Sequence, residues 1–139
     1  MKAYSILDGH GMKLLQESGV TVAIITGRSS QTVALRAREL GIEHVVQGAA
    51  DKLAAWQGLL AGLDLEPAQC AYVGDDLPDL PVLRRCGLAF AVPGAVAMVR
   101  SHAHYVTLAA AGDGAVREVC ELIMTAQGTL EARLARYLR

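Results

Sequence analysis

The sequence feature that most constrains the fold is a continuous apolar run, Val22-Ala23-Ile24-Ile25, followed directly by Thr26-Gly27-Arg28. A strand with one face in water alternates apolar and polar side chains, whereas this run is apolar at every position. Such strands are typical of parallel sheets that are covered on both faces by helices. The run therefore favours an α/β fold.

The rest of the sequence alternates short β-type runs with helical patterns, which predicts a doubly wound, Rossmann-like parallel sheet. The expected strands cover residues 4–7, 21–25, 44–46, 70–73, 88–92 and 105–106. The expected helices cover residues 11–17, 31–40, 52–63, 81–85, 96–101, 115–127 and 130–137. With 139 residues, of which 53% are hydrophobic, the chain is expected to form one domain over residues 1–139.

Composition excludes several classes of partner. The net charge is −1 with no basic block, and there is only one Trp and one Phe, so a nucleic-acid surface is not expected. The longest apolar window, residues 88–99, is too short to span a bilayer, and the amino end does not resemble a signal peptide. The three widely spaced cysteines are expected to be free thiols in a reducing cytoplasm.

A group of carboxylates follows the apolar run at 70–73, in the sequence Gly74-Asp75-Asp76-Leu77-Pro78-Asp79. Adjacent carboxylates at the end of a buried strand are costly unless a cation lies near them, and Mg²⁺ prefers such oxygen ligands. We therefore predict that Asp75, Asp76 and Asp79 form a metal site. Taken alone, the same residues would also fit a turn in which Asp75 caps the next helix and Asp79 lies in its first turn.

Two further motifs lie where strands end. Thr26-Gly27-Arg28 follows the strand at 21–25, and Lys52 begins a helix after the strand at 44–46. Ligands of open parallel sheets bind at the carboxyl ends of the strands. A hydroxyl, a lysine and paired carboxylates at this edge together predict a site for a phosphoryl group and its metal, although Lys52 alone would be read as a surface charge.

A glycine-rich segment, Asp8-Gly9-His10-Gly11, is predicted to be a turn between a strand and a helix. Backbone N–H groups at such a helix start would suit an anionic substrate, so Asp8 and Gly9 are candidate substrate contacts. The alternative is a tight turn with Asp8 as a cap.

Together these motifs resemble the haloacid dehalogenase superfamily of aspartate-nucleophile phosphatases. Residues 24–28 are similar to its second motif, Lys52 to its third and residues 74–79 to its fourth. The chain resembles one group more closely, the 3-deoxy-D-manno-octulosonate (KDO) 8-phosphate phosphatases of lipopolysaccharide biosynthesis. That resemblance includes residues 8–13, 26–42, 72–79 and 114–120, and it extends over essentially all 139 residues.

The resemblance implies a capless fold, a Mg²⁺ cofactor, a small sugar phosphate as substrate and a homotetramer in which neighbouring subunits help close the site. It also implies roles for individual residues. Lys52 would neutralise the phosphoryl oxygens, Thr26 would donate to one of them, Gly27 and Arg28 would contact substrate, Asp75 would ligate the metal, Asp76 would support the metal shell, and Asp79 would position Lys52 or a metal-bound water.

One departure from the family outweighs the others, because no Asp-x-Asp occurs in these 139 residues. In the family that motif supplies the nucleophile and the general acid/base, on a central strand between the two that end here at Thr26 and Gly74. We therefore expect the chain to start some tens of residues into the family's domain, without that strand, and to be inactive by itself. Smaller departures are Leu7 and Asp113, where relatives tend to carry Arg.

Three explanations fit this departure: a misassigned start, a truncation, or a non-catalytic protein that binds sugar phosphates or acts as a scaffold. The motifs also leave a second substrate open, since phosphatases of nonulosonate (sialic-acid-like) 9-phosphates share them.

Overall fold

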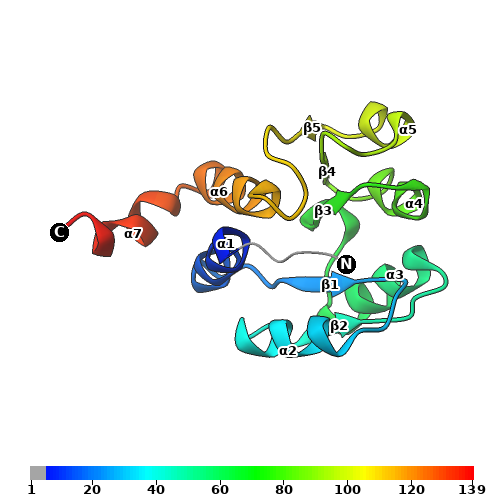
Figure 1. Ribbon diagram of the computed structural model, residues 1–139, viewed down its shortest axis with the longest axis horizontal. Coiled ribbons are helices and arrows are strands. Elements are labelled where there is room, and N and C mark those ends of the chain that lie inside the picture. Colours follow the sequence, from blue (N-terminus) through cyan, green and yellow to red (C-terminus); the bar gives the residue numbers. More distant parts are fainter. Residues whose placement is uncertain (1–5) are drawn as a thin grey trace.

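The computed structural model describes residues 6–139, whose strands form two parallel sheets. In the first sheet, β1 (Ala23–Ile25) pairs with β2 (His44–Val46). In the second, β4 (Leu88–Ala91) lies between β3 (Ala71–Gly74) and β5 (Tyr105–Val106). Every pairing is parallel, so the predicted α/β fold is confirmed (Figure 1).

The helices largely follow the predicted pattern. They are α1 (Ile6–Glu17), α2 (Gln31–Glu39), α3 (Lys52–Leu63), α4 (Leu80–Leu83), α5 (Ala97–Ser101), α6 (Ala115–Gln127) and α7 (Leu130–Leu134), with 3-10 turns η1 (Pro67–Gln69), η2 (Leu77–Asp79) and η3 (Ala135–Tyr137). The bounds of α3, α6, β2 and β5 are those predicted from the sequence. None of the helices within residues 6–139 is both long and apolar enough to cross a membrane, and Cys70, Cys86 and Cys120 are free thiols.

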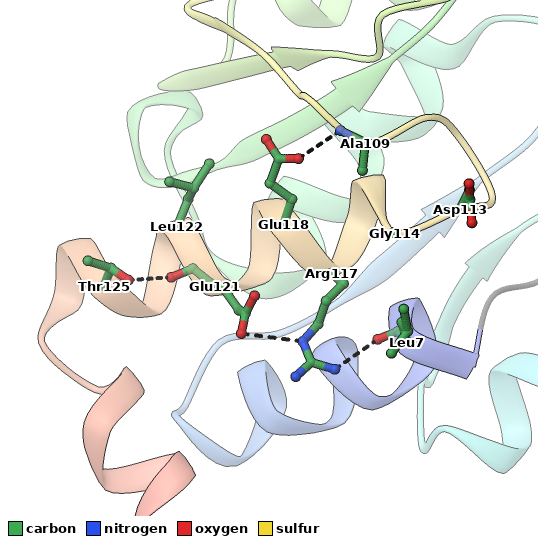
Figure 2. Close-up of a pocket in the computed structure, with 9 residues that line it drawn as sticks. All are labelled: Leu7, Ala109, Asp113, Gly114, Arg117, Glu118, Glu121, Leu122 and Thr125. Atoms are coloured by element: carbon green, nitrogen blue, oxygen red, sulfur yellow. Dashed lines mark hydrogen bonds and ion pairs between the residues drawn. The ribbon is translucent and has the colours of Figure 1, made fainter.

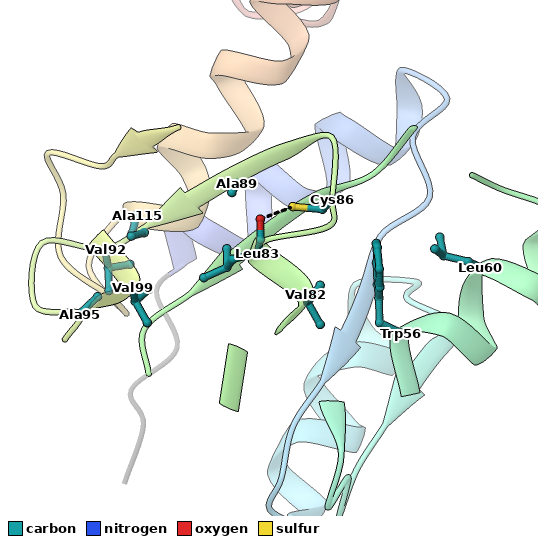
Figure 3. Packing of buried hydrophobic residues seen from close by; sticks show 11 residues of the cluster. Trp56, Leu60, Val82, Leu83, Cys86, Ala89, Val92, Ala95, Val99 and Ala115 are labelled. Carbon is teal, nitrogen blue, oxygen red and sulfur yellow. Dashed lines mark hydrogen bonds between the residues drawn. The ribbon is translucent and has the colours of Figure 1, made fainter. Parts of the chain in front are cut away.

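The two sheets are interrupted between β1 and β3. Within residues 6–139, β1 pairs only with β2 and β3 only with β4. We expected an interruption at this point, and it falls there. A hydrophobic cluster joins the two parts instead. This cluster includes Trp56 of α3 together with Val82 and Leu83 of α4 (Figure 3). Ile25 of β1 is partly buried and packs against the same cluster. The helix α3 therefore bridges the two sheets.

The amino-terminal segment differs from the prediction. Part of the expected strand at 4–7 lies outside the described residues, but Ile6 and Leu7 are helical, and the expected turn at Asp8–Gly11 is the first part of α1. The reason is close packing between helices. A Cβ on Gly9 would collide with the guanidinium of Arg36, and one on Gly11 would lie 2.7 Å from Cδ of Arg117. These glycines let α1 approach α2 and α6 closely.

Candidate functional site

The loop after β1 is tied to the loop that leads into α3. The N–H of Thr26 donates to the carbonyl of Val46 at 2.9 Å, and the Thr26 carbonyl accepts from the N–H of Ala49 at 3.0 Å. The N–H of Arg28 donates to Thr26 Oγ1 at 3.2 Å, and its carbonyl accepts from Gly48. These bonds place Thr26 at the same edge as the start of α3, where Lys52 lies.

Lys52 is the first residue of α3 and forms an ion pair with a buried carboxylate. Asp51 caps the helix by accepting from the N–H of Ala54. Lys52 Nζ lies 2.9 Å from Asp79 Oδ1, and the two side chains are 19% and 4% exposed. The structure therefore brings together two residues that are 27 positions apart in the sequence.

Asp79 accepts hydrogen bonds from four donors. Oδ1 accepts from Lys52 Nζ and, at 2.7 Å, from the hydroxyl of Tyr72. Oδ2 accepts from the N–H groups of Asp75 at 3.0 Å and Asp76 at 3.3 Å. Burial by itself would raise the pKa of the Asp79 carboxyl, but these hydrogen bonds and the ammonium charge outweigh it and hold that pKa below its ordinary 3.8. Asp79 is thus a carboxylate fully engaged in fixing its neighbours.

Sequence reasoning did not single out Tyr72. Burial, and then the charge of Asp79, raise the pKa of its phenol, so the hydroxyl remains a donor. The alternation of side chains along a strand could have pointed to Tyr72. It puts Tyr72 and Gly74 on the same face of β3, and Asp79 packs beside Gly74. A Cβ on Gly74 would lie 2.7 Å from Cβ of Asp79, so the glycine makes the room that Asp79 occupies.

The predicted metal ligands do not form one cluster. Asp75 and Asp76 lie in the exposed segment directly after β3, and Asp76 Oδ1 also accepts from the N–H of Leu77. Mg²⁺ is commonly held by one or two carboxylates, with waters and phosphate oxygens completing its shell, and this pair fits that chemistry. The two oxygens of Asp79 already accept four hydrogen bonds. No three metal-ligating side chains gather at any point of residues 6–139. The geometry therefore favours Asp79 as a partner of Lys52 and not as a ligand, while metal binding by Asp75 and Asp76 stays a prediction.

Asp8 and Gly9 lie in α1, in contact with α6 and α2 respectively. Asp8 is buried in α1, and its Oδ1 accepts from the N–H of Arg117 at 2.8 Å, in the first turn of α6. This bond anchors α1 to α6, and substrate contact by Asp8 and Gly9 stays a prediction. Gly27 and Arg28 are exposed in the loop after β1, as a substrate-contacting loop requires.

A pocket of about 430 Å³ lies beside α6, and none of the predicted site residues lines it (Figure 2). Its Arg117 side chain lies between the carbonyl of Leu7, at 3.4 Å, and the carboxylate of Glu121, at 3.5 Å. Leu7 and Asp113, the two smaller departures from the family pattern, both line it. The full lining is Leu7, Ala109, Asp113, Gly114, Arg117, Glu118, Glu121, Leu122 and Thr125.

Comparison with known proteins decides the family. The family model of haloacid dehalogenase-like hydrolases matches residues 7–87, which include Thr26, Lys52 and Asp75. The chain belongs to the haloacid dehalogenase-like hydrolase family. Within that family, the 3-deoxy-D-manno-octulosonate 8-phosphate phosphatase KdsC of Yersinia pestis is 50% identical over 131 residues, which are 94% of this chain and 70% of the relative.

Solved structures of haloacid dehalogenase-like proteins share the fold. A probable YrbI family phosphatase from Pseudomonas syringae pv. phaseolica matches with a TM-score of 0.97 and 55% identity, covering 100% of this chain and 79% of that one. The 3-deoxy-D-manno-octulosonate 8-phosphate phosphatase of Moraxella catarrhalis, solved with a magnesium ion, a phosphate ion and KDO, matches with a TM-score of 0.96 and 48% identity, covering 99% of this chain and 79% of that one. The resemblance found in the sequence is thus confirmed at the level of the family and the fold.

Proposed function

We propose that this chain carries the phosphoryl-binding part of a Mg²⁺-dependent phosphatase that hydrolyses KDO 8-phosphate to KDO and phosphate in lipopolysaccharide biosynthesis. The observation that carries the proposal is the pair of Lys52 and the buried Asp79, which is hydrogen-bonded to the backbone N–H groups of Asp75 and Asp76. About half of the residues are identical to those of phosphatases named for this substrate, which supports the sugar.

Different residues of the chain would bind different parts of the substrate and its metal. The ammonium of Lys52 has three donors and spends one on Asp79, so the others can meet phosphoryl oxygens. Thr26 Oγ1 accepts from the N–H of Arg28, which leaves the hydroxyl hydrogen to donate to a further oxygen. Gly27 and Arg28 would contact the sugar acid from the exposed loop. Mg²⁺, when bound by Asp75 and Asp76, would neutralise charge on the transferred group.

The nucleophile that the family requires is not among these residues, because the 139 residues contain no Asp-x-Asp. Experiments therefore use the complete gene product, meaning the polypeptide that its gene encodes in full. The DNA upstream of the Met1 codon is the first thing to read, since an in-frame Asp-x-Asp there would support the enzyme. We further propose that the protein is cytoplasmic, which its free thiols support, and that it forms a homotetramer, as the family resemblance implies.

The test is phosphate release by the complete gene product from KDO 8-phosphate and from a nonulosonate 9-phosphate, with and without Mg²⁺. We expect Mg²⁺-dependent release with preference for KDO 8-phosphate, and a tetrameric mass by light scattering. Faster release from the nonulosonate 9-phosphate would reassign the substrate. Tight binding of a sugar phosphate with no release from either compound would instead establish a non-catalytic protein.

Variants test the site itself. Lys52→Ala should lower turnover by about 100-fold or more, because it removes a positive charge that acts on the transferred oxygens. Thr26→Val should cost less, about tenfold, since it removes one neutral donor. Asp75→Asn should raise the Mg²⁺ concentration needed for half-maximal rate. Lys13→Ala, on the exposed side of α1, is the matched control for charge and should leave turnover unchanged. Wild-type turnover in Lys52→Ala would show that the site is misplaced.

A further inference from the structure

Tyr72 holds an unusual place relative to Lys52. It lies in the middle of β3, and its hydroxyl reaches the same oxygen, Asp79 Oδ1, that the Lys52 ammonium contacts. The two donors approach at 2.7 Å and 2.9 Å, and both side chains are partly buried. One anionic oxygen thus links a neutral donor from a sheet to a charged donor from a helix.

The hydrogen bonds also fix the plane of the carboxylate. Two backbone N–H groups, of Asp75 and Asp76, hold Oδ2. If these were the only rigid contacts, the carboxylate could turn about Oδ2, and Oδ1 would follow the long and flexible Lys52 side chain. A phenol is stiff and is here anchored in a strand, so it sets the position of Oδ1 independently of Lys52. The phenol also takes a share of the charge on Oδ1, which leaves the ammonium freer to pair with a second anion.

We propose that Tyr72 is a positioning residue for the phosphatase reaction, fixing Asp79 Oδ1 so that the Lys52 ammonium is presented to the phosphoryl group. This inference rests on the proposed function, since it assigns Tyr72 a role in that same site. Tyr72 itself contacts neither substrate nor metal in this role, and it acts only through Asp79 and Lys52. Removing its hydroxyl should therefore slow the reaction without weakening the binding of the sugar.

The experiment is a double-mutant cycle in the complete gene product, with steady-state kinetics on KDO 8-phosphate and on p-nitrophenyl phosphate. Tyr72→Phe removes only the hydroxyl and should lower kcat about tenfold, the effect of one hydrogen bond to a charged group, with KM changed less than twofold. In a Lys52→Ala background the same substitution should change kcat less than twofold, because the residue it positions is gone. Tyr105→Phe is the matched control, because Tyr105 lies on a different strand, β5, and its phenol also interacts with a carboxylate, that of Glu118 in α6. It should leave kcat unchanged.

The outcomes separate this inference from the proposed function. Equal losses from Tyr72→Phe in the wild-type and Lys52→Ala backgrounds would show a merely structural role and overturn the inference. An unchanged kcat in Tyr72→Phe would do so too. If the wild type releases phosphate from p-nitrophenyl phosphate but not from KDO 8-phosphate, the substrate is wrong, and the cycle still decides the role of Tyr72 on the first compound. If neither compound is hydrolysed, the proposed function and the inference both fall.

Discussion

Asp79→Asn is the substitution whose effect follows most directly from the structure. Asn has nearly the shape of Asp but has one acceptor oxygen and one NH₂ group. Every group that meets the Asp79 carboxylate is a donor: Lys52 and Tyr72 on Oδ1, and the N–H groups of Asp75 and Asp76 on Oδ2. Either orientation of the amide therefore sets its NH₂ against donors. In the place of Oδ1 the NH₂ group would face the Lys52 ammonium and the Tyr72 hydroxyl, and in the place of Oδ2 it would face two backbone N–H groups.

The magnitude follows from burial. Removing one partner of a buried ion pair costs about 3–5 kcal/mol. The lower end applies here, because the Lys52 side chain keeps 19% exposure and can partly recover water. We expect the free energy of unfolding to fall by about 3 kcal/mol and the midpoint of thermal unfolding by about 12 °C, which is roughly 4 °C per kcal/mol for a chain of this size.

The assay is urea unfolding of the complete gene product, followed by circular dichroism at neutral pH. Asp76→Asn is the matched control. Asp76 is exposed, and the amide oxygen of Asn could still accept from the N–H of Leu77. We expect that control to remain within about 0.5 kcal/mol of wild type. An Asp79→Asn variant as stable as wild type would refute the four-donor argument, and so would an equal loss in the control.

Three smaller perturbations test other parts of the structure. Asp8→Ala should lower the free energy of unfolding by about 1–2 kcal/mol in urea unfolding, because it strands a backbone N–H in the first turn of α6. Two backbone N–H groups of the loop before α6 donate to Glu118; burial would raise the pKa of this carboxyl, but the hydrogen bonds hold it below the ordinary 4.5. The stability that Glu118 adds over Glu118→Gln is thus complete above about pH 4.5 and should shrink in urea titrations as the pH falls further. Gly74→Ala should cost about 1–3 kcal/mol by the same method and slow turnover, because its Cβ would press on Asp79, whereas Gly62→Ala, with open space around it, should not destabilise.

The fold was largely predictable because the sequence of each helix and strand is by itself typical of that element. The bounds of α3 follow from Asp51 as a cap and from an apolar helical pattern up to residue 63, and the structure has them unchanged. Short β-branched runs such as His44–Val46 gave strands at the expected places. The register of strand pairing was less predictable, because it depends on contacts between distant residues, whereas the break between the two sheets followed from the absence of Asp-x-Asp.

The candidate site was predictable in its residue types and less so in its contacts. Lys52 and Asp79 were both selected from the sequence, and the family resemblance left Asp79 to position either Lys52 or a metal-bound water. The contact with Lys52 is the one observed, and it depends on how η2 folds back over Gly74. The segment at Asp8–Gly11 misled, because glycines that allow helices to pack closely look the same in sequence as glycines that form a turn. The two kinds of glycine are distinguished only by the side chains of α2 and α6 that lie against them in the folded protein.

The interruption between β1 and β3 has a consequence for how the protein responds to its own ligand. Thr26 extends from the first sheet, while Asp75 extends from the second, and Lys52 starts the helix that bridges them. A phosphate dianion that contacts Thr26 and Lys52, together with a Mg²⁺ ion held by Asp75, would connect the two sheets across the junction, where the described backbone makes no connection. Binding to the folded state alone raises stability by RT ln(1 + [L]/Kd), which is about 2.7 kcal/mol at a ligand concentration of 100 Kd. Inorganic phosphate with Mg²⁺ should therefore protect this protein against heat and proteolysis, most strongly at the contact between its two halves.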